Sequence, residues 1–124
     1  MSVIEFHGRL ADAALYYFIF LSVWGYWRFF RKQGLDSAFW GAVVIGEILL
    51  LLQTGLGGYM WVIGLSSTRW VHYLYGIVTP MALPMIFMYT RGKQERPEML
   101  MYGTTTLITV VLILRAMSTA GAGG

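Results

Sequence analysis

The segment FWGAVVIGEILLLLQTGLGGYMWVI, residues 39–63, decides the fold of this chain. It contains a single charged residue, Glu47. A bilayer core about 30 Å thick is crossed by roughly 20 apolar residues in helical conformation, so this segment predicts a transmembrane helix. The composition agrees, because 57% of the 124 residues are hydrophobic and 12% are charged. A soluble domain carries about 25% charged residues.

Three further apolar segments, residues 10–30, 70–90 and 98–117, predict three more transmembrane helices. The linkers between them are short and polar. Asp36 or Ser37 is a suitable N-cap for the second helix, and Pro97 suits the first turn of the fourth. Short linkers make consecutive helices antiparallel neighbours. The sequence therefore predicts an all-α membrane protein, a single up-down-up-down bundle of four transmembrane helices over residues 1–124.

The basic residues are distributed unevenly between the two sides of this bundle. The linkers after the first and third helices carry six of them, Arg28, Arg31, Lys32, Arg91, Lys93 and Arg96. The other side has three, Arg9, Arg69 and Arg115. Lys and Arg accumulate in cytoplasmic loops, which places both termini on the non-cytoplasmic side. These residues flank apolar segments and form no solvated patch, so nucleic acid is not an expected partner.

Glu47 is the residue that a purely structural helix does not explain. A carboxylate inside a bilayer costs several kcal/mol unless it is protonated or paired, so such acids are candidates for function. Pro80 and Pro84 in the third segment deprive the carbonyls of Gly76 and Pro80 of their usual helical partners. One interpretation is a protonated Glu47 that donates to such a carbonyl and ties two helices together. The others are a proton relay and a hydrogen bond to a quinone head.

His72 opens a second candidate site. His72, Gly76, Pro80 and Pro84 recur every four residues, along one side of the third helix. A glycine one turn from a histidine leaves room for a flat ligand such as haem b. The other histidine, His7, precedes the first helix on the same side of the membrane, in a segment that we expect to be mobile. A His7–His72 haem site, a haem or pigment edge supplied by a partner, and an ordinary interfacial histidine are the alternatives.

A few polar and small residues are expected to hold helices together. Asp12 and Arg115 come to comparable depth near the non-cytoplasmic ends of the first and last helices. They are a candidate ion pair, with snorkelling of Arg115 to the interface as the alternative. Gln53 is mid-helix and suits an interhelical hydrogen bond worth about 0.6 kcal/mol. Ala42 and Gly46 allow a close approach between helices.

Catalytic and metal-binding motifs are missing from the sequence. Cysteine is absent, which excludes disulfides, thiolate metal sites and covalently attached haem. There is no HExxH, no glycine-rich phosphate loop and no catalytic triad, and the loops are too short to build a soluble active site. The eight methionines suit packing better than copper binding. We therefore expect no enzymatic activity and no metal site, and no cofactor other than the haem or quinone considered above.

Four stretches carry a resemblance: FWGAVVIGE (39–47), HYLYG (72–76), YTRGK (89–93) and LRA (114–116). Through them, residues 10–117 resemble a family of small four-span proteins of phototrophic bacteria that has no established activity. The resemblance implies an accessory subunit of an electron-transfer complex in the bacterial inner membrane. Alternative complex III, a quinol-oxidising complex with its haems and iron–sulfur clusters on other subunits, is the first candidate. A photosynthetic reaction-centre or light-harvesting complex is the second.

These observations leave three hypotheses of function. The first is a non-catalytic subunit that stabilises larger membrane subunits of an electron-transfer complex, in contact with lipids and forming a wall of a lipid or quinone pocket. The second is a small haem- or quinone-binding redox protein that uses His72 with His7 or Glu47. The third is a proton or small-solute carrier, which requires Glu47 to titrate while it faces water.

Overall fold

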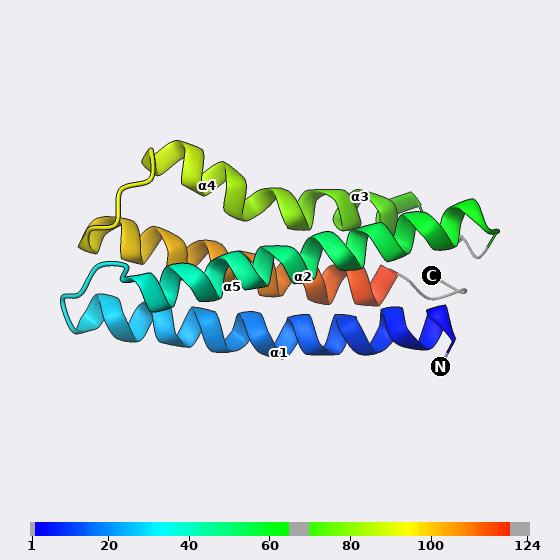
Figure 1. The fold of residues 1–124 in the computed structure, drawn as a ribbon, viewed down its shortest axis with the longest axis horizontal. Coiled ribbons are helices and arrows are strands. Elements are labelled where there is room, and N and C mark those ends of the chain that lie inside the picture. The colour runs from blue at the N-terminus through cyan, green and yellow to red at the C-terminus, as the bar shows by residue number, and fades with distance from the viewer. Residues whose placement is uncertain (1, 65–69, 120–124) are drawn as a thin grey trace.

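A computed structural model describes residues 2–64 and 70–119, and every regular element in those ranges is helical. The elements are α1 (Val3–Phe30), α2 (Ser37–Val62), α3 (Trp70–Val78), the short 3-10 turn η1 (Thr79–Met81), α4 (Ala82–Thr90) and α5 (Arg96–Thr119). Figure 1 shows α3, η1 and α4 as one continuous rod, so four antiparallel rods lie side by side. Arg69, which entered the charge comparison above, lies outside the described residues.

Three of the four rods are long and apolar enough to cross a membrane: Ser37–Val62, Trp70–Thr90 and the Arg96–Ser118 part of α5. The first rod, α1, is not among them. It begins at Val3, seven residues before the expected start, and so includes Glu5, Arg9 and Asp12. Ser2 caps it by accepting a hydrogen bond from the amide of Glu5. The chain is therefore a helical membrane protein with three candidate spans, and a fourth span with both termini outside stays a prediction.

The two described loops meet at one end of the bundle, which we call the basic end (residues 31–36 and 91–95). The carboxylate of Asp36 accepts from the amide of Phe39 and so caps α2, and it also pairs with Arg28 at 3.2 Å. The Leu35 amide donates to the Gln94 carbonyl, which joins the two loops. A Cβ on Gly34 would lie 2.2 Å from that carbonyl oxygen, so only glycine fits there.

The closest contact between helices is the crossing of α1 over α5 at two glycines. A Cβ on Gly25 would lie 3.0 Å from the Cα of Gly103, so the two backbones touch with no side chain between them. Hydrogen bonds reinforce the crossing: Ser22 donates to the Gly103 carbonyl at 3.3 Å, and the hydroxyls of Tyr26 and Thr104 lie 2.9 Å apart. The crossing fixes α1 against the long apolar helix α5.

The contact between α1 and α2 uses the small residues that the sequence indicated. A Cβ on Gly46 would lie 2.9 Å from the ring of Phe18, so the fully buried phenyl ring fills the space that this glycine leaves. The Tyr17 hydroxyl donates to the Ala42 carbonyl. Ala42 and Gly46 therefore do allow close approach, and an aromatic ring and a phenol from α1 occupy the gap.

Pro80 interrupts the third rod and leaves the Gly76 carbonyl without its helical donor. Thr54 on α2 supplies the replacement, because its hydroxyl donates to the Gly76 oxygen at 2.7 Å. We expected Glu47 for such a role at Gly76 or Pro80. Thr54, about two helical turns after Glu47 on α2, bonds to the Gly76 oxygen instead.

Packing differs between the two halves of the bundle. Buried residues of α1 begin only at Ala14, those of α2 end at Leu50, and α3 has none. The opposite end, which we call the histidine end, comprises the start of α1, the end of α2, α3 and the end of α5. In the described part of this end, half-buried polar side chains lie between the helices. In the other half, aromatic rings and aliphatic side chains form a buried core.

Gly25→Ala is expected to separate α1 from α5, because the new methyl group meets backbone that cannot move aside. The free energy of unfolding should fall by about 1–3 kcal/mol, as overpacking does in tight cores. Gly41→Ala is the matched control, since a Cβ there has open space within 4 Å. Thermal unfolding in mild detergent, followed by circular dichroism, measures both variants. Equal midpoints for the two would contradict the crossing.

Candidate functional site

His7 and His72 face one another across the histidine end of the bundle. Their ring centroids lie 6.4 Å apart and their ring planes are at 86°. We expected His7 in a mobile segment before the first helix. It lies instead in the second turn of α1, which the Ser2 cap starts five residues earlier. The two histidines of the chain, at positions 7 and 72 of 124, are thus brought together by the fold.

Each histidine is anchored by a backbone contact. The Nδ1 of His72 lies 2.8 Å from the Ala116 carbonyl on α5, so this nitrogen carries the proton and donates. The Nε2 of His72 is then the nitrogen with a free lone pair. Gln53 on α2 donates to the His7 carbonyl at 2.8 Å, which fixes the backbone that carries His7. Two further helices, α5 and α2, therefore hold the pair in place.

Glycines flank the two rings. A Cβ on Gly57 would lie 3.5 Å from Cε1 of His7, so this ring sits directly against the backbone of α2. Gly76, one turn after His72, has nothing within 4 Å of the position where a Cβ would be. The side of Gly76 is therefore open, whereas the side of Gly57 is filled by the His7 ring itself.

Two buried polar atoms at this end have no hydrogen-bond partner among the described residues, Nδ1 of His7 and Oε1 of Gln53. A buried polar group without a partner costs several kcal/mol in a membrane, where no bulk water is available to replace it. Atoms of this kind mark places where a bound group completes the structure. Both belong to the residues that hold the histidine pair.

The spacing of the rings matches that of two axial ligands on one metal ion. An imidazole nitrogen binds a transition metal at about 2 Å, and the ring centre lies about 1 Å behind it. Two imidazoles on opposite sides of a haem iron therefore have centroids about 6 Å apart, whatever the angle between their planes. Among the described residues no group of three or more metal-ligating side chains occurs, so a bare ion would lack ligands, whereas a porphyrin supplies four nitrogens itself.

Burial favours the neutral form of His7. Burial, and then the neighbouring His72, lower the pKa of His7 below its ordinary value of 6.5. Neutral imidazole is the form that binds metals, since protonation removes the lone pair. Arg9 follows His7 on α1, and the guanidinium of Arg115 lies 5.9 Å from the ring centroid of Tyr75. These cations suit the carboxylates of a haem at the same end.

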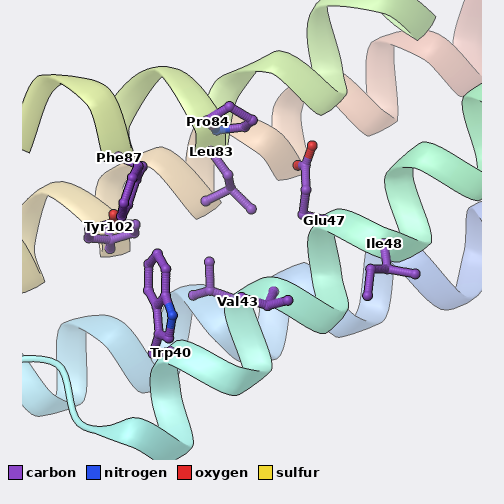
Figure 2. Close-up of a pocket in the computed structure, with 9 residues that line it drawn as sticks. Trp40, Val43, Glu47, Ile48, Leu83, Pro84, Phe87 and Tyr102 are labelled. Carbon is purple, nitrogen blue, oxygen red and sulfur yellow. The ribbon is translucent and has the colours of Figure 1, made fainter. Parts of the chain in front are cut away.

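Glu47 lies away from the histidines, in a groove of about 230 Å³. The groove is lined by Trp40, Val43, Val44, Glu47 and Ile48 of α2, Leu83, Pro84 and Phe87 of α4, and Tyr102 of α5. In Figure 2 the carboxyl group of Glu47 points from α2 toward Pro84, while Trp40, Phe87 and Tyr102 gather at the other end. The Oε1 atom of Glu47 is buried and has no hydrogen-bond partner among the described residues.

The Asp12–Arg115 ion pair stays a prediction. Asp12 is exposed on α1, and the contact of Arg115 that can be described is the one with the Tyr75 ring. The sequence also offers Gly55, Gly57 and Gly58 as positions of close approach, and Gly57 does lie against the His7 ring. Sequence reasoning missed the role of the Ala116 carbonyl, because a backbone oxygen has no signature in a sequence.

Comparison with known proteins finds no matching family model, no matching curated protein and no matching solved structure. The site is therefore interpreted from its own geometry and chemistry.

His7 is expected to titrate below pH 6.5 in the folded protein without added ligands. Because the unfolded chain then binds more protons than the folded one, the free energy of unfolding should fall as the pH drops below about 6.5. His72→Gln should raise the pKa of His7 part of the way back, since burial, the larger cause, remains. NMR of the histidine rings in detergent measures this without ambiguity, because the variant has one histidine. A His7 pKa at or above 6.5 in the wild type would contradict the pairing.

Proposed function

We propose that this chain is a membrane redox protein that binds one haem b between His7 and His72. The observation that carries the proposal is the 6.4 Å separation of the two ring centroids, which suits a shared metal ion without rearrangement of the rings. His7 and His72 would hold the group, which would supply single-electron transfer when bound. We therefore prefer the haem-binding redox protein to the non-catalytic subunit.

The surroundings of the rings support the same assignment. A ligating histidine ordinarily donates its second ring nitrogen to a carbonyl, and His72 does so to Ala116. Cofactor sites of helical bundles are built from side chains on facing helices. The lack of cysteine leaves non-covalent haem b as the form that fits. Gly76, one turn after His72, has open space where a Cβ would be.

Haem binding is tested on the chain purified in mild detergent, with hemin added in stoichiometric amount. We expect a Soret band with low-spin absorbance, saturating at one haem per chain, that His7→Ala and His72→Ala each abolish. The near-perpendicular ring planes predict a strongly anisotropic low-spin ferric EPR signal. Glu47→Gln is the control and should keep the band, because Glu47 lies outside the histidine site. A colourless wild type, or a band that survives both histidine variants, would refute the proposal.

A second candidate is the accessory subunit without a cofactor, and a specific surface favours it. On α1 the rings of Phe18 and Trp24 turn inward, but Tyr16, Phe20 and Trp27 remain 70%, 60% and 59% exposed. Bulky aromatic groups of this kind are enriched in contacts between proteins. Larger membrane subunits of an electron-transfer complex, alternative complex III first, are the partners that we propose for this face. Residence in the bacterial inner membrane belongs to the same proposal.

Co-purification from native membranes tests this partnership. A tagged chain extracted in mild detergent should bring larger electron-transfer subunits with it in fixed stoichiometry. A double variant, Tyr16→Ser with Phe20→Ser, should release the chain from them, whereas Val62→Ser, equally exposed but on α2, should not. Recovery of the wild-type chain alone would sink the accessory-subunit candidate and leave the haem proposal unaffected.

A further inference from the structure

In the groove beside Glu47, too, a buried polar atom has no hydrogen-bond partner among the described residues. Its walls are apolar or aromatic, and the carboxyl group of Glu47 is the acid among the nine lining residues. The groove arises because α2 packs against α3 and η1 more closely than against α4. Figure 1 shows α4 rising away from α2 toward the basic end. Both helices are candidate spans, so the groove opens toward lipid rather than toward a loop.

The unpartnered oxygen of Glu47 decides which kind of occupant fits. An acyl chain would fill the apolar walls but leave the carboxyl group without a partner, at a cost that the membrane interior makes large. A protonated carboxyl group donates and an ionised one accepts. A quinone carbonyl accepts a hydrogen bond and so suits the protonated carboxyl group. A quinol hydroxyl donates one and so suits the ionised carboxylate.

The aromatic end of the groove suits a flat ring. Trp40 and Phe87 lie with ring centroids 5.4 Å apart and planes tilted by 34°, and Trp40 meets Tyr102 edge-on at 6.0 Å. Aromatic rings attract further rings in offset or edge-on arrangements. The volume of about 230 Å³ is below that of sites that enclose drug-sized molecules, roughly 300–1,000 Å³. A one- or two-ring head fits, and its isoprenoid tail would remain in the lipid.

We infer that the groove between α2 and α4 binds the head of a membrane quinone, with the carboxyl group of Glu47 as its hydrogen-bond partner and Trp40 and Phe87 against its ring. The inference goes beyond the haem proposal and does not depend on it, because none of the nine residues belongs to the histidine site.

The test is a fluorescence titration of the detergent-solubilised chain with a short-chain naphthoquinone. Binding beside Trp40 should quench tryptophan emission in a saturable manner. Glu47→Leu should raise the Kd at least tenfold, and Glu47→Gln, which keeps a hydrogen-bonding group, about threefold. Glu98→Gln is the matched control and should leave the Kd unchanged, since its buried Oε1 is also without a partner among the described residues but lies outside the groove.

A second variant keeps the inference testable if Glu47→Leu does not fold. Val44 lines the groove and is 42% exposed, so Val44→Trp should fill the mouth and abolish quenching without disturbing the core. Non-saturable quenching in the wild type, or an unchanged Kd in Glu47→Leu, would overturn the inference. So would native preparations in which phospholipid or a membrane alcohol, and no quinone, is retained in amounts that depend on Glu47.

The outcome is separable from that of the haem test. His72→Ala should lose the Soret band and keep quinone binding, and Glu47→Leu should do the reverse. A wild type that binds quinone but no haem would refute the proposed function alone.

Discussion

The contact of two backbones at Gly25 and Gly103 is the constraint on which the rest of the bundle depends. Of the four rods, α1 is the one that is not among the candidate spans. It lies against the apolar helix α5, and at Gly25 the two backbones meet without an intervening side chain. In lipid, close backbone approach replaces the hydrophobic effect as the force between helices. Nearer the start of α1, His7 lies against His72 of α3.

Several polar side chains of this bundle bond to backbone oxygens of neighbouring helices, and others, among them Thr90, Thr106 and Thr109, bond to carbonyls of their own helix. The Thr54 hydroxyl donates to the Gly76 carbonyl, which Pro80 leaves without its helical donor. Gln53 donates to the His7 carbonyl, and His72 to that of Ala116. Each of these three bonds satisfies a side chain and ties two helices in one step, which suits a solvent that offers no partners. Buried atoms without a partner among the described residues occur on His7 at the histidine end, on Glu47 in the groove, and also on Glu98 outside both sites. Such an atom therefore points to a ligand only together with the geometry around it.

Local signals made part of this fold predictable. Hydropathy predicted the four helical rods, and Asp36 was one of the two predicted N-caps of α2. Both signals depend only on residues that are neighbours in the sequence. Ala42 and Gly46 indicated a close approach but not the rings of α1 that fill it. The start of α1 was missed because Glu5, Arg9 and Asp12 interrupt the apolar pattern while leaving helix formation intact. The partner of the Gly76 carbonyl, the Gly25–Gly103 crossing and the facing of His7 and His72 depend on how each helix is rotated in the bundle. Short segments of sequence do not encode that rotation.

The two candidate sites share α2, and this helix sets the distance between them. Gln53, which holds the backbone of His7, follows Glu47 by six residues, a rise of about 9 Å along the helix. A quinone head in the groove would therefore lie about two turns of helix from a haem at the histidine end, within a single chain. The tightly packed core lies toward the basic end, and the described part of the histidine end is packed more loosely. If both proposals hold, a small helical chain without cysteine would carry two redox groups at a separation that α2 sets.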